Sequence, residues 1–287
     1  MPPEVPKFGR LGLAGRNLLN SAISRGVFSA LFPSDCRLCS VPLSNISRLP
    51  VCEACLLAMT PISGVTCEVC GERLGLRAAT NGNQLCLMCR GERPHFTKAI
   101  AYGAYDGELR ELIHLLKYER VEPAANVLGR MLAEATAKLT LKSASVLVIA
   151  VPLHRSKRRE RGFNQAELIA RAALKQNPIH GAELDFDAFE RVRLTVSQVG
   201  LTRAQRADNM RGAFRVKHLN RVAGREILLV DDVLTTGTTA NECARVLRKA
   251  GAEEVWVATV ARTLKESDAT TTGLKNFEAA MEDRQEF

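Results

Sequence analysis

Long apolar runs are missing from this 287-residue chain, and aromatic residues are scarce. Because no stretch of about twenty uncharged apolar residues occurs, no segment is expected to span a membrane. The N-terminal region lacks a continuous apolar stretch and a clean small-residue cleavage site, which argues against a secretory signal peptide. The single tryptophan, Trp256, falls in an apolar run, where we expect a core residue. We therefore expect a cytoplasmic protein with few aromatic side chains for stacking on bases.

Apolar side chains recur at helical spacing through the first 33 residues, with Arg10, Arg16 and Arg25 between them. The pattern predicts an amphipathic helical segment over residues 1–33. We favour a helix that packs on the protein itself. The alternative is a helix that binds a partner or a membrane surface, which would place the protein peripherally at the inner face of the membrane. The apolar positions are Leu11, Leu18, Leu19, Ala22, Ile23, Val27, Ala30 and Leu31.

Positive charge exceeds negative charge, since 40 Lys and Arg residues stand against 31 Asp and Glu residues for a formal net charge of +9. This balance favours anionic partners, which include phosphorylated substrates, nucleic acid and an acidic membrane surface. It does not choose among them.

Cysteine is the residue type with the most informative spacing, because eight of the nine cysteines form four Cys-x-x-Cys pairs. Two intervening residues allow both thiolates of a turn to reach one tetrahedral ion. Twelve residues separate the first pair from the second and fifteen separate the third from the fourth. Such spacing is typical of zinc sites. The pairs are Cys36 and Cys39, Cys52 and Cys55, Cys67 and Cys70, and Cys86 and Cys89.

We predict a double zinc ribbon over residues 34–94 with two structural Zn²⁺ ions, because four thiolates fill a tetrahedron and leave no position for water. The simplest arrangement joins the first pair with the second and the third with the fourth, and the spacing leaves a cross-braced arrangement open. Disulfides are the competing explanation, but they are typical of small secreted proteins. Cys243 stands apart and is predicted to be a packed small residue.

Residues 227–239 carry the clearest ligand-binding motif, Ile-Leu-Leu-Val-Asp-Asp-Val-Leu-Thr-Thr-Gly-Thr-Thr. Four consecutive apolar residues predict a strand buried on both faces, and it leads into Asp231 and Asp232. A helix is predicted over about 238–250. Its N-terminus, the hydroxyl-rich loop and a permissive glycine would form an anion site. The candidate anion ligands are Thr235, Thr236, Gly237, Thr238 and Thr239.

This motif resembles the signature with which type I phosphoribosyltransferases bind PRPP (5-phosphoribosyl 1-diphosphate). By that resemblance the loop binds the 5-phosphate, and Asp231 and Asp232 bind the ribose 2- and 3-hydroxyls. The alternative is a buried strand whose exit turn happens to carry two acids and a threonine N-cap.

The rest of the chain alternates predicted strands and helices after about residue 95. Apolar runs at 146–151 and 254–261 predict two further strands, and helices are predicted at 105–119, 123–142 and 164–175. Alternation of this kind predicts an α/β fold with a mainly parallel sheet flanked by helices. Such sheets bind ligands at the C-terminal ends of their strands. We place this domain at 95–264 and expect the tail at 265–287 to be disordered.

Residues 154–161 are predicted as a basic loop that follows strand 146–151. This loop resembles the pyrophosphate-binding loop of type I phosphoribosyltransferases, which assigns PRPP binding to His154, Arg155 and Lys157. Arginine suits that role because it contacts phosphate oxygens in a bidentate manner. Nucleic-acid binding and a plain solvated surface are the alternatives.

Residues 191–214 precede the acid-pair strand, where phosphoribosyltransferases carry a loop that closes over the substrate. By that resemblance Arg206 and Asn209 belong to a flexible closing loop that excludes water. A solvent-exposed linker helix is the alternative.

Four motifs occur in a specific order. The cysteine module precedes Tyr-x-Gly-x-Leu-Arg-x-Leu-Ile-x-x-Leu-Lys-Tyr at 105–118 and Val-Pro-Leu-His…Arg-Gly-Phe-Asn-Gln at 151–165. Thr195, Gln198, Arg206, Asn209 and Gly-Ala-Phe at 212–214 follow, and the acid-pair motif comes last. Over roughly residues 30–264 the chain resembles the ComF family of competence-associated phosphoribosyltransferase-like proteins.

The resemblance implies a type I phosphoribosyltransferase fold with a small N-terminal zinc-ribbon module, and PRPP and Mg²⁺ as ligands. It implies transfer of phosphoribose to an acceptor that the sequence does not identify, with Asp231 and Asp232 as the catalytic candidates. It also implies an association with DNA uptake in natural competence. The alternative is a non-catalytic protein of the DNA-uptake machinery that uses the same fold to bind single-stranded DNA or a partner protein.

Overall fold

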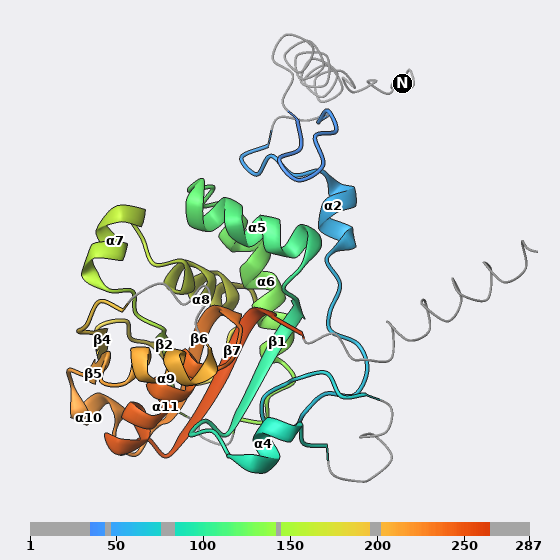
Figure 1. Ribbon diagram of the computed structural model, residues 1–287. Coiled ribbons are helices and arrows are strands. Elements are labelled where there is room, and N and C mark those ends of the chain that lie inside the picture. Colours follow the sequence, from blue (N-terminus) through green and yellow to red (C-terminus); the bar gives the residue numbers. More distant parts are fainter. Residues whose placement is uncertain (1–34, 44–46, 76–83, 142–144, 196–201, 265–287) are drawn as a thin grey trace, which may run out of the picture. The chain divides into compact units, whose positions relative to one another are not determined.

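The computed structural model describes residues 35–43, 47–75, 84–141, 145–195 and 202–264 (Figure 1). The predicted amphipathic segment at 1–33 and the tail after residue 264 lie outside these ranges. The chain divides into two compact units, Met1–Ala58 and Met59–Phe287. This division falls between the second and third Cys-x-x-Cys pairs, inside the range predicted for the double zinc ribbon. Within the described ranges, no helix has both the length and the apolar character that crossing a bilayer requires.

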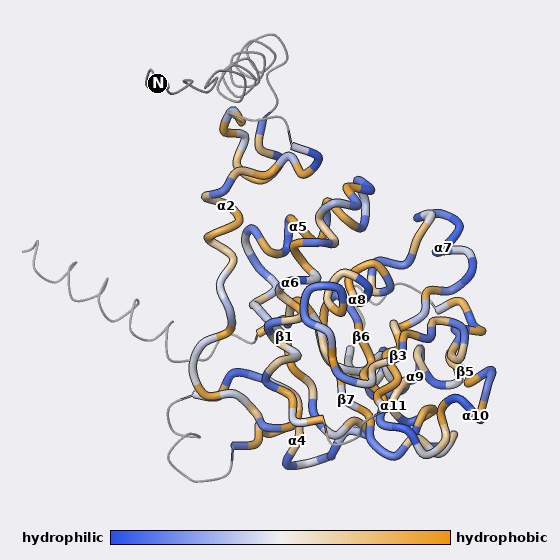
Figure 2. Tube along the Cα trace, turned by 180° about the vertical axis from the view of Figure 1, so that it is seen from behind, coloured by the Kyte–Doolittle hydropathy of each residue, from blue (hydrophilic) through white to orange (hydrophobic). Residues whose placement is uncertain are grey.

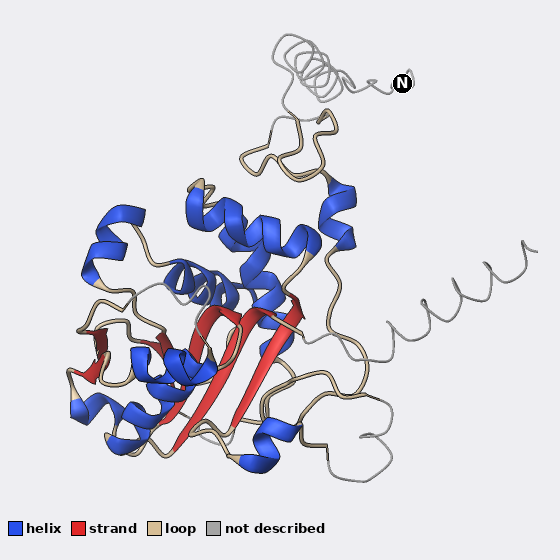
Figure 3. Cartoon of the chain, viewed as in Figure 1, coloured by secondary structure: helices blue, strands red, loops and turns tan. Residues whose placement is uncertain are grey.

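A five-stranded parallel sheet forms the centre of the larger unit (Figure 3). Its strand order is β1-β7-β6-β2-β3, and every neighbouring pair is parallel. The predicted α/β class with a mainly parallel sheet is therefore confirmed. The strands are β1 (Lys98–Ala104), β2 (Val146–Ala150), β3 (Ala182–Leu184), β6 (Glu226–Leu234) and β7 (Glu254–Arg262).

Alternation along the central strand β6 builds a core on each face of the sheet, since successive side chains in a strand point to opposite faces. Ile227 and Leu229 belong to a buried cluster with Leu247 of helix α11. Leu228 and Val230 line a small space on the other face together with residues of helices α6 and α8. The continuous apolar run of β6 thus reflects burial on both faces.

Helices cover both faces of this sheet (Figure 1). Helices α6 and α8 pack against each other so closely that a Cβ atom at Gly129 would lie 2.5 Å from the Ala172 Cβ. The helix predicted over 123–142 ends earlier, at Thr136. The helices are α2 (Glu53–Ala58), α4 (Leu87–Gly91), α5 (Gly107–Tyr118), α6 (Ala124–Thr136), α7 (Arg155–Arg161), α8 (Gln165–Gln176), α9 (Arg203–Met210), α10 (Leu219–Val222) and α11 (Thr238–Lys249).

Residues 155–161 form helix α7, so the prediction of a loop over 154–161 was wrong. The helix begins after His154, whose ring Nδ1 accepts a hydrogen bond from the Ser156 N–H, and it ends at Gly162 in the left-handed region (φ 88°). The segment is mostly hydrophilic and has no buried residue, so it carries no apolar periodicity that would predict a helix (Figure 2).

A two-stranded antiparallel ribbon lies outside the main sheet and brackets residues 192–213. It consists of β4 (Phe189–Arg191) and β5 (Phe214–Val216). The Phe189 and Phe214 rings stack with centroids 5.5 Å apart, and both side chains are buried. The two stacked rings therefore pack the ribbon against the hydrophobic core.

Candidate functional site

The threonine-rich loop joins the end of β6 to the start of α11. Gly237 has φ 75° and ψ 1°, a left-handed conformation that favours glycine, and α11 begins at the next residue. The Thr236 and Thr238 hydroxyls lie 2.9 Å apart. Thr235 and Thr236 are exposed, whereas the residues at 237–239 are half-buried. Hydroxyl donors and the N-terminus of a 12-residue helix thus meet in one loop, which is a favourable site for an anion.

Asp231 and Asp232 lie in the last half of β6, at the carboxyl edge of the sheet. The Asp231 carboxylate accepts a hydrogen bond from the Asp232 N–H at 2.9 Å. Asp232 is buried, and its Oδ1 lies 2.8 Å from the Nζ of Lys117. Among the described residues, the other oxygen of Asp232 is buried without a hydrogen-bond partner.

Lys117 lies in the last turn of α5, and the sequence analysis gave it no role. It follows the buried Ile113 by four residues, so it lies on the apolar face of an amphipathic helix. A lysine among apolar positions of a predicted helix was the one sequence signal for this role, because a charge on the buried face of a helix needs a partner of opposite charge.

Burial and neighbouring charges shift the pKa values of Asp231 and Lys117. Burial, followed by the neighbouring Asp232 charge, raises the pKa of Asp231 to about 7, although Lys117 and Arg191 act in the opposite direction. Burial by itself lowers the pKa of Lys117, but the Asp232 carboxylate outweighs it, so the Lys117 pKa is raised. Lys117 therefore stays cationic, and Asp231 titrates near neutral pH.

Arg191 is a second residue that the sequence analysis did not assign to the site. Burial lowers the pKa of Arg191, while Cys243 and Asp231 act in the opposite direction. Its guanidinium lies 5.5 Å from the centroid of the Phe214 ring and donates to the Thr195 hydroxyl. The β4–β5 ribbon thus brings a cation to the α11 side of Asp231.

Arg206 and Asn209 lie on α9, a helix that packs against α11, and both are half-exposed. The Glu242 carboxylate of α11 accepts a hydrogen bond from the Gly212 N–H at 2.9 Å, just after α9 ends. A helix therefore occupies part of the segment predicted as a closing loop. The closing role of Arg206 and Asn209 stays a prediction.

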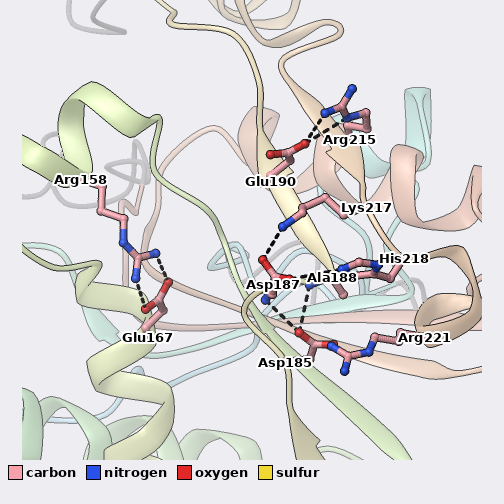
Figure 4. Close-up of polar contacts among 10 residues, drawn as sticks. All are labelled: Arg158, Glu167, Asp185, Asp187, Ala188, Glu190, Arg215, Lys217, His218 and Arg221. Carbon is pink, nitrogen blue, oxygen red and sulfur yellow. Dashed lines mark hydrogen bonds and ion pairs between the residues drawn. The ribbon is translucent and has the colours of Figure 1, made fainter.

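Ion pairs fasten the start and end of the β4–β5 ribbon (Figure 4). Asp187 contacts Lys217 and lies 3.2 Å from the His218 ring, and Arg221 donates to Asp185 at 2.7 Å. The Asp185 carboxylate also accepts the Ala188 N–H at 3.0 Å. These contacts fix where the chain enters and leaves residues 192–213.

The basic residues of α7 differ in how they are paired. Arg158 makes a bidentate contact with Glu167, at 2.6 and 3.0 Å (Figure 4). Lys157 lies 3.1 Å from Glu160 on the same helix. Within the described ranges Arg155 and Arg159 make no ion pair and are exposed, which leaves both for an anionic ligand. The predicted role of His154, Arg155 and Lys157 in binding pyrophosphate stays a prediction.

Eight cysteines form two separate clusters, and the simple series arrangement holds. The cross-braced alternative is excluded, because within each cluster the four ligand atoms lie within 4.8 Å of one another. Tetrahedral Zn–S bonds of about 2.3 Å would set sulfur atoms about 3.8 Å apart. The observed sulfur distances include 3.9, 3.6 and 3.6 Å, so both clusters fit zinc. The clusters are Cys36, Cys39, Cys52 and Cys55, and Cys67, Cys70, Cys86 and Cys89.

Comparison with known proteins agrees with this architecture. The double zinc ribbon domain family matches residues 27–90, and the phosphoribosyl transferase domain family matches residues 164–278. The chain is 33% identical over 238 residues to the DNA utilization protein YhgH of Shigella flexneri, which covers 81% of this chain and 98% of that protein. It is 32% identical over 225 residues to competence protein F of Haemophilus influenzae, with 76% and 93% covered.

The chain belongs to the ComF family. Competence protein ComFC of Bacillus subtilis is a more distant relative, 25% identical over 208 residues that cover 70% of this chain and 79% of that protein. As a ComF protein the chain combines a phosphoribosyltransferase fold with two cysteine clusters of the zinc-ribbon type, as the sequence motifs predicted.

Proposed function

We propose that this ComF protein binds PRPP together with Mg²⁺ at the carboxyl edge of β6. The observation that carries the proposal is the juxtaposition of the acid pair at the carboxyl end of β6 with the threonine loop at the N-terminus of α11. The loop at 235–239 would bind the 5-phosphate, and the acid pair would accept hydrogen bonds from the ribose hydroxyls. His154, Arg155 and Lys157 would contact the pyrophosphate, and Mg²⁺, when bound, would neutralise part of its charge.

The enzymatic form of the proposal is transfer of phosphoribose. An acceptor attacks C1 of the ribose, the bond from C1 to the pyrophosphate oxygen breaks, and pyrophosphate leaves with the electron pair. Because the transition state resembles an oxocarbenium ion, the protein needs no nucleophile of its own. Its residues act by fixing the ribose and by stabilising the charge of the leaving group.

Isothermal titration of the zinc-loaded protein with PRPP and Mg²⁺ tests the proposal. We expect a dissociation constant on the order of micromolar. Asp231→Asn, and separately Thr235→Val with Thr236→Val, should each weaken binding by about tenfold or more, because each removes contacts to a charged ligand. Glu111→Gln makes the same charge change at an exposed position of α5 and should leave the affinity unchanged. A folded wild-type protein that does not bind PRPP would refute the proposal.

Binding of single-stranded DNA is the second candidate function, and the observation that favours it is that α7 carries two exposed arginines, Arg155 and Arg159, without an ion pair among the described residues. If Arg155 and Arg159 contact phosphates, replacing both by Ala should lower the slope of log affinity against log salt by about 1.4 for single strands. Lys138→Ala with Lys249→Ala removes the same charge from exposed positions elsewhere and should not change the slope. An unchanged slope in the Arg155 and Arg159 variant would exclude DNA binding through α7.

We also propose a cellular role for this protein, which the names of its relatives suggest. A protein similar to competence protein F and to a DNA utilization protein would act in the uptake or use of DNA, with a partner from the competence machinery. We place it in the cytoplasm, with attachment to the inner face of the membrane as the alternative. Loss of transformation on deletion, restored by the wild-type gene and not by Asp231→Asn, would tie this role to the ribose-phosphate site.

A further inference from the structure

Helix α7 carries basic residues proposed to bind pyrophosphate, yet none of its own residues is buried. A helix without an apolar face cannot be fixed by apolar packing, so polar contacts must hold it. Arg158 forms its bidentate contact with Glu167 of α8. The contacts at the C-terminal end of α7 come from a different helix, α5.

Two contacts join the end of α5 to the end of α7. The Arg120 guanidinium donates a hydrogen bond to the Glu160 carbonyl oxygen at 2.7 Å. The Arg161 guanidinium lies 5.6 Å from the centroid of the Tyr118 ring, within the range of a cation–π contact. Helix α5 follows the carboxyl end of β1 and α7 follows the carboxyl end of β2, so the two helices meet on the ligand side of the sheet (Figure 1).

Arg120 has a backbone conformation that favours glycine. Its φ is 57°, and among the described residues only Ser40 is another non-glycine residue with a positive φ. Helices commonly end with glycine in this left-handed conformation, because a Cβ atom is crowded there. Strain of this kind persists where the side chain does something that glycine cannot do. The Arg120 side chain is exposed, and its hydrogen bond to Glu160 is the contact that glycine would lose.

Tyr118 is supported by residues that lead back to the sheet. Its ring meets the His114 ring edge-on, with the centroids 5.2 Å apart. The His114 Nε2 in turn lies 2.9 Å from the hydroxyl oxygen of Tyr105, and the Tyr105 N–H donates to the Arg262 carbonyl of β7. Tyr118 itself is 67% exposed, so burial does not account for its place. A row of contacts thus runs from the ends of β1 and β7 through α5 to α7.

We propose that Tyr118 and Arg120 are positioning residues, which fix α7 so that His154, Arg155 and Lys157 can bind the pyrophosphate group of PRPP. The inference rests on the proposed PRPP site and adds two residues that contact no ligand themselves. Both act at the C-terminal end of a seven-residue helix, and a helix this short moves as one piece. Fixing its end therefore fixes its start, and a site that is already ordered binds more tightly than one that must be ordered on binding.

Two ligands separate this role from a general loss of structure. PRPP carries the pyrophosphate, whereas ribose 5-phosphate lacks it and would use only the threonine loop and the acid pair. In the zinc-loaded full chain, Arg120→Gly should weaken the binding of PRPP with Mg²⁺ by about tenfold. Tyr118→Ala should weaken it by about threefold. The affinity for ribose 5-phosphate should change by less than about twofold in both variants.

Conservative variants and a matched control sharpen the test. Arg120→Lys keeps a cationic donor and should bind PRPP within about threefold of wild type. Tyr118→Phe keeps the ring and should bind PRPP as the wild type does. Arg110→Ala removes a cation from the exposed surface of α5 and should leave the affinity unchanged. Because glycine relieves the left-handed strain, Arg120→Gly should lower the melting temperature by less than about 2 °C.

Hydrogen exchange at the Arg158 and Gly162 amides reports on α7 itself, because both amides donate to carbonyls of that segment. In Arg120→Gly these amides should exchange about tenfold faster, while the amides of α11 keep their rates. Loss of PRPP affinity with unchanged exchange in α7 would mean that Arg120 contacts the ligand directly, and would overturn the inference.

Two further outcomes would overturn it. One is an equal loss of affinity for PRPP and ribose 5-phosphate in Arg120→Gly, which would indicate damage to the whole site. The other is PRPP affinity that stays at the wild-type value in both Arg120→Gly and Tyr118→Ala. A folded wild type that binds neither PRPP nor ribose 5-phosphate would instead refute the proposed function on which the inference rests.

Discussion

The two cysteine clusters share a motif and a geometry, but they belong to different compact units. The first, Cys36, Cys39, Cys52 and Cys55, lies wholly in the unit that ends at Ala58. The second, Cys67, Cys70, Cys86 and Cys89, lies in the larger unit, and two of its cysteines are buried in the core cluster with Phe96 and Ala99. The same zinc motif thus occurs once in a small unit and once as part of a larger hydrophobic core.

Specific contacts join the second cluster to the sheet. The Val69 carbonyl accepts the Ala99 N–H at 2.7 Å, at the start of β1. Arg262 of β7 donates to the Cys70 carbonyl and to Glu72, both at 2.6 Å. Both members of this Arg262–Glu72 pair are largely buried. Arg262 also pairs in register with Leu234, the last residue of the strand that leads into the threonine loop.

Removing one cluster at a time should give the largest contrast. Cys67→Ser with Cys70→Ser should lose one zinc per chain and lower the melting temperature of the larger unit by about 10 °C, because zinc binding and core packing are coupled there. Cys36→Ser with Cys39→Ser should also lose one zinc but shift the main transition by less than about 2 °C. Elemental analysis and calorimetry measure both quantities. Equal shifts in the two variants would show that burial of the second cluster in the core does not couple its zinc to the stability of the larger unit.

Arg262 joins the second cluster to β7, and replacing it should destabilise the protein less than removing the cluster does. Arg262→Met should cost about 3 kcal/mol of unfolding free energy, because it removes a largely buried ion pair to Glu72 and the hydrogen bond to the Cys70 carbonyl. Arg48→Met, at an exposed position of the first unit, should change stability by less than about 0.5 kcal/mol. Chemical denaturation of both variants provides the comparison. A cost for Arg262→Met as small as that of the control would show that the Arg262–Glu72 pair does not stabilise the contact between the second cluster and the sheet.

The residue after the first Cys-x-x-Cys pair of each cluster gives the finest comparison. Ser40 and Gly71 occupy equivalent turns, with φ 60° and 71°, and each donates its N–H to the cysteine four residues earlier. Ser40 is exposed, whereas a Cβ at Gly71 would lie 3.1 Å from the Ala99 carbonyl oxygen.

Gly71→Ser should therefore cost about 1–2 kcal/mol, from left-handed strain and from crowding against β1. Ser40→Gly should change stability by less than about 1 kcal/mol, because it relieves strain but frees the unfolded chain. Thermal unfolding with zinc bound measures both. If Gly71→Ser is as mild as Ser40→Gly, the second cluster does not pack on the sheet as described.

Local patterns predicted the parts of this molecule whose signals are short in sequence. The apolar run at 227–230 predicted the central strand because a strand buried on both faces leaves no polar position. Cys-x-x-Cys spacing predicted the clusters because two thiolates of one turn must reach one ion. The basic run of α7 was misread, since a helix that buries no residue shows no periodicity. Strand β3 was missed because it has three residues and a charged centre.

The sequence by itself determined the α/β class, the order of the motifs, the ComF resemblance and the identity of the eight cysteines, because each depends on residues a few positions apart. Only the tertiary structure decided which cysteine pairs share a cluster, that Arg262 holds Glu72, and that Lys117 neutralises Asp232. The two members of the Arg262–Glu72 pair, and of the Lys117–Asp232 pair, are far apart in the chain and meet only through the parallel crossovers of the sheet. The same pleat sends two adjacent acids to opposite faces, and a lone sequence does not show which of them meets a lysine.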